Sequence, residues 1–431
     1  MIRSLLCGAL ILSLSTPLAL SAEQEATSLS TEEASTSLES LWKKYAEDYK
    51  SSADYKAFGE LPPALPAKPD KNFKLVAKGI KTGEHTMPFV VLNKTPEEGK
   101  KSPLYICLHG GGQFGKAEGP HAWPVNTREW QTQISLAAGR YPKHGVFFVP
   151  RMADDRLGRW YHDLNVDVFD RMIKHAIIEW NVDPNKVYLL GISEGGYGTD
   201  KLLPYMADRF AAGNSMAAGS LVKIGSYTTA ENLRDTPMRT DIGGNDTMFN
   251  RIGLAKELHQ VLDEFENANP GHYTHKINIH EGKGHGGWDY GLGPVWLAQH
   301  TRDPQPSKLV WVTSPAQKLT RPMFYWLGLT GNNIPKDCRI EAHADKAKNI
   351  INIKADVIDK ENDKLTPLTG VALNVFLNDK LINLDQAFTV NINGTKVHEG
   401  KAPRLDKHLS ETIKMTGDPT QAYPVILKFE L

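Results

Sequence analysis

The sequence predicts an α/β fold: a mostly parallel sheet with helices on both faces, followed by a small β-rich C-terminal domain. Between about residues 71 and 305, short apolar runs alternate with amphipathic helical stripes, as in a parallel sheet with crossover helices. After about residue 306 the chain becomes rich in β-branched and apolar runs, and no long helical period follows residue 345. We therefore expect two folded domains, over 71–305 and 306–431.

The expected elements of the first domain follow from the period of the apolar residues. Buried strands are predicted over 73–76, 89–92, 104–108, 145–150, 187–190, 238–242 and 277–280. Helices are predicted over 127–138, 166–180, 200–206 and 254–265. In the second domain, strands are predicted over 349–358, 371–377 and 423–429, and Asn393-Gly394 predicts a hairpin turn.

The composition is that of a globular protein. The 431 residues include 50 Lys and Arg and 50 Asp and Glu, so the formal net charge is zero. A nucleic-acid binder usually carries a basic excess, so no nucleic-acid partner is expected. The chain is long enough to bury a large core without a disulfide or a metal.

The N-terminus predicts export. Arg3 precedes an apolar segment over 5–20, and small residues near position 22 offer a cleavage site, so 1–22 is predicted to be a signal peptide. The alternative is an uncleaved membrane anchor, which Pro17 and the polar stretch that follows disfavour. After cleavage no stable membrane insertion is expected. Residues 23–70 are predicted to form a flexible leader over 23–35, one amphipathic helix and a proline-rich linker.

Two cysteines remain after such a cleavage, Cys107 and Cys338, and they fall in different predicted domains. Cys107 lies in an apolar run, where a buried free thiol is common. An exported protein can also pair its cysteines, and the sequence leaves that choice open.

One motif places a serine on a sharp turn. Gly191-Ile192-Ser193-Glu194-Gly195 follows a short buried run and precedes a predicted helix. A serine between a strand and a helix is pushed out of the sheet with its hydroxyl exposed, and the flanking glycines allow a tight turn.

Two further glycine-rich loops follow predicted strands. In the loop 109–112, Gly111 and Gly112 leave backbone N–H groups free of side chains, so these can face a developing oxyanion. In the loop 282–287, His285 lies among glycines after the last predicted strand of the first domain. This position distinguishes His285 from the other 14 of the 15 histidines.

Three acids lie between or near the serine and this histidine. Asp246 follows a predicted strand on a Gly-Gly turn that can bend its carboxylate toward His285. Asp241 lies within the strand, and Asp289 follows the histidine, out of the expected order. We expect Asp246 to accept a hydrogen bond from Nδ1 of His285.

With these motifs the chain resembles the α/β-hydrolases over about 71–305. It is similar in particular to exported esterases related to polyhydroxybutyrate depolymerases, dienelactone hydrolases and the catalytic domains of prolyl oligopeptidases. The resemblance implies Ser193 as nucleophile, His285 as base and Asp246 as its orienting acid. It also implies an oxyanion hole formed by the N–H of Glu194 and one near Gly111 or Gly112. It calls for no metal and no organic cofactor.

The expected function is an exported serine hydrolase that cleaves carboxylic esters, including acyl groups on polysaccharides, through an acyl-enzyme. Its partner would be a small-molecule or polysaccharide ester, and the C-terminal domain is not expected to be catalytic. The candidate pocket walls are Trp123, Trp160, Tyr161 and Trp288. One alternative is a peptidase of the prolyl oligopeptidase type with the same triad. Another is a binding protein on a hydrolase scaffold, which would normally lack one member of the triad.

Overall fold

The computed structural model describes residues 28–65, 75–95, 98–313, 321–331 and 334–431. The predicted signal peptide, and the first residues of the predicted leader, lie outside the described residues. Within the described residues, no helix is both long and apolar enough to cross a lipid bilayer.

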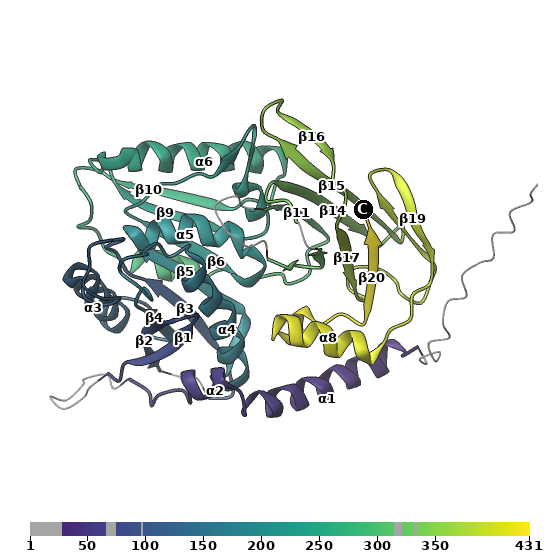
Figure 1. The fold of residues 1–431 in the computed structure, drawn as a ribbon, viewed down its shortest axis with the longest axis horizontal. Helices are drawn as coiled ribbons and strands as arrows, with labels where there is room; N and C mark the ends of the chain where they lie inside the picture. Colours follow the sequence, from purple (N-terminus) through teal and green to yellow (C-terminus); the bar gives the residue numbers. More distant parts are fainter. Residues whose placement is uncertain (1–27, 66–74, 96–97, 314–320, 332–333) are drawn as a thin grey trace, which may run out of the picture.

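The first part of the chain forms an eight-stranded mixed sheet (Figure 1). Its strands, in spatial order, are β1 (Lys78–Thr82), β2 (His85–Lys94), β4 (Gly145–Pro150), β3 (Ser102–Leu108), β5 (Val182–Ile192), β6 (Ala212–Met216), β9 (Met238–Gly243) and β10 (His275–His280). Strand β2 is antiparallel to both neighbours, and the pairs from β4 to β10 are parallel. Of the predicted strand over 73–76, residues 73 and 74 lie outside the described residues, and residues 75 and 76 are not in a strand, because β1 begins at Lys78.

Helices cover both faces of this sheet, as the alternation of strands and helices predicts. One face packs against α4 (Asp163–Glu179), α5 (Glu194–Tyr205) and α6 (Arg251–Ala268), and the other packs against α3 (Pro124–Gly139) and α7 (Leu292–Leu297). Along β3, Leu104 and Ile106 face the first set, whereas Tyr105 and Cys107 face the second. A strand buried on both faces is apolar throughout, which is why its sequence is a continuous hydrophobic run.

The second part of the chain is β-rich, as predicted, and consists of two sheets around a shared apolar core. One sheet has the order β11 (Lys308–Val312), β14 (Cys338–Asp345), β15 (Ile350–Asp359), β18 (Phe388–Ile392) and β19 (Thr395–Gly400), with β16 (Lys364–Pro367) paired to β15. The other has the order β12 (Met323–Phe324), β13 (Leu327–Thr330), β17 (Ala372–Leu377) and β20 (Val425–Glu430). In the first part of the chain, a separate two-stranded sheet is formed by β7 (Lys223–Ile224) and β8 (Tyr227–Thr228).

The hairpin signal is correct in detail. Strands β18 and β19 pair up to Ile392 and Thr395, and only Asn393 and Gly394 lie between them. Both turn residues have positive φ, 50° and 81°, which a type I′ turn requires and which asparagine and glycine tolerate.

Three helical segments differ from the sequence expectations. Helix α8 (Asp406–Thr416) contradicts the expectation that no helix follows residue 345; it buries Leu409 and Ile413, which are four residues apart. Helix α1 (Thr31–Tyr49) begins inside the predicted flexible leader, because Ser30 and Glu33 form a reciprocal capping box. Helix α2 (Ala53–Phe58) follows it and was not expected.

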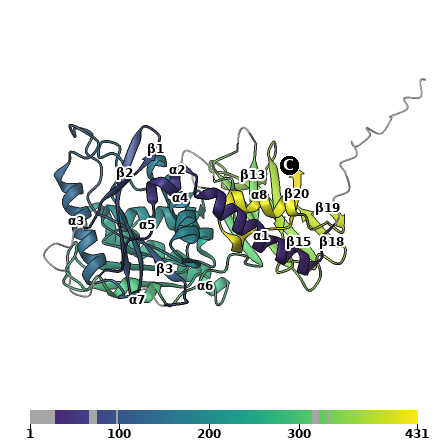
Figure 2. The ribbon, with the colours of Figure 1, turned by 90° about the horizontal axis from the view of Figure 1, so that it is seen from below.

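The two parts of the chain contact each other along several segments. Helix α1 runs beside α8 and reaches from the C-terminal part to α4, where the hydroxyl of Tyr49 lies 3.2 Å from His175 Nδ1 (Figures 1 and 2). Buried Arg302 donates to Asp418 at 2.6 Å and to the carbonyl oxygen of Asp208 at 2.7 Å. Cys107 and Cys338 are buried free thiols, so they do not form the disulfide that the sequence left open.

Candidate active site

The turn between β5 and α5 holds Ser193 in a strained conformation. Its φ of 56° and ψ of −113° lie outside the regions that residues with a side chain prefer. The motif glycines make the turn possible. A Cβ on Gly191 would lie 2.1 Å from the carbonyl oxygen of Gly195, and one on Gly195 would lie 2.3 Å from that of Leu108. The sharp turn therefore lifts the serine hydroxyl out of the carboxyl edge of the sheet.

The loops after β9 and β10 bring an acid and a histidine to this serine. His285 Nε2 lies 2.9 Å from Ser193 Oγ, and His285 Nδ1 lies 2.7 Å from Asp246 Oδ2. The two loops pack closely because position 243 is glycine: a Cβ there would lie 1.9 Å from the carbonyl oxygen of Gly284. The contact expected between Asp246 and His285 is therefore present, and the three side chains form one hydrogen-bonded series.

Arg251 holds the other oxygen of the acid. Its Nη1 donates to Asp246 Oδ1 at 3.0 Å, and its Nε donates to the hydroxyl of Tyr197 at 3.1 Å. With one oxygen on Arg251 and the other on His285, the carboxylate of Asp246 has a fixed orientation. Neither competing acid takes this place: Asp241 contacts His280, and the Asp289 carboxylate accepts the N–H of Gly291.

The glycine loop after β3 lies against the serine. A Cβ on Gly110 would lie 3.4 Å from Ser193 Cβ. Buried His109 anchors this loop: its Nε2 accepts the N–H of Met152 at 3.2 Å, so its Nδ1 carries the proton and donates to the carbonyl oxygen of Gly110. Burial lowers the pKa of His109 to about 3, so the ring stays neutral.

The two candidate glycines of the oxyanion hole differ. The N–H of Gly112 donates to Asn126 Oδ1 at 3.0 Å, so it is already engaged. The N–H of Gly111 has no hydrogen-bond partner within the described part of the chain, which makes it the better candidate donor. Glu194 begins α5, and the first N–H groups of a helix have no partner inside the helix. The arrangement thus offers one donor from each side of Ser193.

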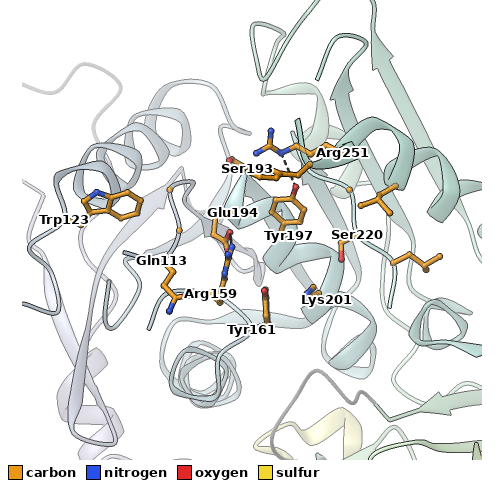
Figure 3. Close-up of a pocket in the computed structure, with 16 residues that line it drawn as sticks. Gln113, Trp123, Arg159, Tyr161, Ser193, Glu194, Tyr197, Lys201, Ser220 and Arg251 are labelled. Atoms are coloured by element: carbon orange, nitrogen blue, oxygen red, sulfur yellow. Dashed lines mark hydrogen bonds and ion pairs between the residues drawn. The ribbon is translucent and has the colours of Figure 1, made fainter. Parts of the chain in front are cut away.

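A cavity of about 530 Å³ opens beside Ser193 (Figure 3). Trp123 and Tyr161 line it, as the sequence predicts. The other two expected wall residues do not. Trp160 is fully buried and donates its indole N–H to the carbonyl oxygen of His109 at 2.9 Å, whereas Trp288 stacks on the ring of His280.

Several lining residues were not foreseen from the sequence. Tyr197 and Lys201 lie four and eight residues after Ser193, on the same face of α5, so helical spacing from the serine could have found them. The remaining unforeseen residues come from loops at the same edge of the sheet: Gln113, Arg159, Gly219, Ser220, Leu221 and Phe249, with Arg251 and Leu254 on α6. Every lining residue lies before residue 255, so the described cavity belongs to the first part of the chain.

The side chain of Glu194 faces this cavity. Its carboxylate pairs with Arg159, while its Oε1 is buried and has no hydrogen-bond partner among the described residues. Burial raises the pKa of Glu194, and the charge of Arg159 opposes part of this shift. A Cβ on Gly112 would lie 3.6 Å from Glu194 Oε2, so this carboxylate borders the glycine loop.

The strand order, the serine turn between β5 and α5 and the positions of the acid and histidine loops define an α/β-hydrolase fold. No protein-family profile matches the chain. No curated protein matches it either.

Solved structures similar to the chain include three hydrolases. A thermostable esterase is 19% identical, with a TM-score of 0.38, and the match covers 53% of this chain and 63% of the esterase, less than two thirds of its length. A ferulic acid esterase is 16% identical, with a TM-score of 0.37 and coverage of 52% and 98%. An acylaminoacyl peptidase from Pyrococcus horikoshii is 16% identical, with a TM-score of 0.35 and coverage of 50% and 38%. Similarities this low carry no argument about activity, which has to come from the site.

Proposed function

We propose that this chain is a serine hydrolase that cleaves carboxylic esters through an acyl-enzyme. The observation that carries the proposal is the hydrogen-bonded series from Asp246 through His285 to Ser193, on a strained turn that opens into a cavity. A serine hydroxyl is a weak nucleophile unless a neutral imidazole takes its proton, and the imidazole needs a carboxylate to fix its tautomer.

In the proposed reaction, Ser193 Oγ attacks the ester carbonyl carbon while its proton passes to His285 Nε2. The tetrahedral oxyanion is held by the N–H groups of Glu194 and Gly111, each contributing about 3 kcal/mol to the lowering of the barrier. His285 then gives the proton to the leaving alkoxide, and the alcohol departs. Water then attacks the acyl-enzyme while its proton passes to His285, and His285 returns this proton to Ser193 Oγ as the acid departs.

The substrate is proposed to be an ester outside the cell, including acyl groups on polysaccharides. Support for export comes from the signal peptide predicted over 1–22. Support for a cyclic substituent comes from the outer wall of the cavity, where Trp123 stacks on exposed Phe114 with ring centroids 5.4 Å apart. Aromatic faces of this kind bind apolar and ring-shaped groups.

A fluorophosphonate probe tests the chemistry directly. The wild-type chain should become labelled and should hydrolyse 4-nitrophenyl butyrate. Ser193→Ala should do neither. Amino-acid 4-nitroanilides, assayed in parallel, separate an esterase from a peptidase of the prolyl oligopeptidase type. Labelling that persists in Ser193→Ala would contradict the assignment of the nucleophile. Faster turnover of the anilides than of the esters would favour the peptidase.

A further inference from the structure

The charged side chains that line the cavity beside Ser193 are mostly cationic. Three cationic side chains line it, Arg159, Lys201 and Arg251, against one carboxylate, that of Glu194. Two of the cations already have an acidic partner, because Arg251 pairs with Asp246 and Arg159 pairs with Glu194.

Lys201 is different. Within the described part of the chain its ammonium makes no hydrogen bond and no ion pair; it lies 4.0 Å from the centre of the Tyr161 ring. The side chain is partly buried, and burial lowers the pKa of Lys201. The charges of Glu194 and Asp200 oppose part of this shift, but neither acid forms an ion pair with Lys201. A cation that is partly removed from water without a directly bonded acid is costly, so its position favours an anion supplied by a ligand.

The nearest acid in the sequence does not fully balance this charge. Asp200 is buried, and neither of its carboxyl oxygens has a hydrogen-bond partner of good geometry among the described residues. Burial raises the pKa of Asp200 to about 7, so near neutral pH the group is only partly ionised. It also does not line the cavity, whereas Lys201 does.

Arg159 lies on the same side of the cavity as Lys201, across from Ser193 (Figure 3). Its backbone is held in the left-handed region, with φ 54°, directly after Gly158 with φ 53°. Asn165 Nδ2 donates to the carbonyl oxygen of Arg159 at 2.8 Å and secures this conformation. A guanidinium has five N–H donors, so the pair with Glu194 leaves donors available for a second acceptor.

We propose that Arg159 and Lys201 form a subsite for a carboxylate, and that the preferred substrates are esters whose acyl or alcohol part carries an acidic group. The inference rests on the proposed ester hydrolysis at Ser193. A single negative charge matches the one lining cation that forms no ion pair within the described part of the chain, and the planar fork of arginine suits a carboxylate.

Two matched substrate pairs test this subsite. In the first, 4-nitrophenyl hydrogen adipate is compared with 4-nitrophenyl hexanoate, which places the acid on the acyl side. In the second, 4-acetoxybenzoate is compared with its methyl ester, which places it on the alcohol side. The wild-type chain should favour the acidic member of one pair by about tenfold in kcat/KM, and Lys201→Met should remove that preference, since a buried charge partner is lost.

Two lysine variants serve as controls. Lys201→Arg keeps the charge and should keep most of the preference. Lys256→Met removes one charge from an exposed position of α6 outside the cavity lining and should leave the ratio within a pair unchanged. Hydrolysis of the neutral esters without preference for the acidic ones, or a preference that survives in Lys201→Met, would overturn the subsite while leaving ester hydrolysis standing.

A binding measurement separates this proposal from the proposed function. In titration calorimetry, Ser193→Ala should bind monomethyl adipate more tightly than dimethyl adipate, and the difference should vanish when Lys201→Met is added. If no ester were hydrolysed but this difference remained, the hydrolase assignment would fail and the anion subsite would stand. Equal binding of the two ligands would refute the subsite.

Discussion

Two Asp–His pairs lie at the same end of the sheet. They share the same kind of hydrogen bond but differ in the exposure and the surroundings of the histidine. Asp241 Oδ1 lies 3.1 Å from His280 Nε2, and Asp246 Oδ2 lies 2.7 Å from His285 Nδ1. In both pairs the acid is buried. The side chain of His280 is 19% exposed, whereas that of His285 is 43% exposed and faces Ser193.

The environment of the first pair is closed. Asp241 accepts hydrogen bonds from Arg239, Asn214 and Asn278 as well as from His280, so its two oxygens are saturated within the sheet. The ring of His280 stacks on Trp288, with ring centroids 4.7 Å apart. The second pair ends at a hydroxyl on a strained turn, beside a cavity. An Asp–His pair of this kind becomes reactive when the histidine nitrogen that does not contact the acid faces a nucleophile. The two pairs should therefore respond differently to the same substitution.

The largest expected difference is in turnover. Asp246→Asn should lower kcat on 4-nitrophenyl butyrate by about 10³–10⁴, because the amide favours the wrong imidazole tautomer. Asp241→Asn should lower kcat by less than about tenfold, because among the described residues it is His285, and not His280, that is hydrogen-bonded to Ser193. Steady-state kinetics of both variants, with circular dichroism to verify folding, measures this. Equal losses would show that the two pairs act as one unit.

The next difference is in stability. Asp241→Asn should lower the free energy of unfolding by about 3 kcal/mol, because it leaves the buried guanidinium of Arg239 without a carboxylate. Asp246→Asn should cost less, because within the described residues the carboxylate of Asp246 accepts two side-chain hydrogen bonds, from Arg251 and His285, whereas that of Asp241 accepts five. Urea unfolding of the wild type and the two variants at pH 7 gives their free energies of unfolding. A larger loss in Asp246→Asn would reverse the comparison.

The pair of Asp241 and His280 also predicts how stability depends on pH. Burial opposes ionisation of Asp241, but hydrogen bonds and charge from Arg239 more than offset it, so the pKa of Asp241 lies below its ordinary value. An acid with a lowered pKa in the folded state stabilises the protein above its unfolded-state pKa, and this contribution is lost as the pH falls through the folded-state pKa. The stability difference between wild type and Asp241→Asn should therefore be full at pH 6 and shrink below about pH 4. A constant difference from pH 6 to pH 3 would contradict this sign.

The smallest expected effect concerns the strained turn at Ser193, beside the pair of Asp246 and His285. Ser193→Gly should be more stable than Ser193→Ala by about 1 kcal/mol, because only glycine adopts φ 56°, ψ −113° without strain. Both variants lack the hydroxyl, so the difference isolates the backbone. Thermal or urea unfolding of the matched variants measures it, and equal stabilities would mean that the turn stores no strain.

Much of the fold could be predicted because local sequence and tertiary environment agree. The continuous apolar runs of β3 and β4 mark strands buried on both faces, and the Asn393-Gly394 turn fixes its hairpin. Strand β6 was missed, because its sequence, Ala-Gly-Asn-Ser-Met, carries no β-branched or aromatic residue. Its small residues are needed for packing: a Cβ on Gly213 would lie 2.5 Å from the side chain of Leu203 on α5.

The fold class, the serine turn and the histidine and acid that could reach it are all predictable from the sequence, because glycine spacing and the order of strands are local or topological properties. The burial of Trp160 and the hydrogen bond by which Arg251 orients Asp246 become visible only in the folded chain. The same holds for Arg159 and Lys201, which meet in one cavity. These properties depend on loops and helices that are far apart in the sequence and converge at one edge of the sheet, and no local pattern encodes which of their side chains come into contact.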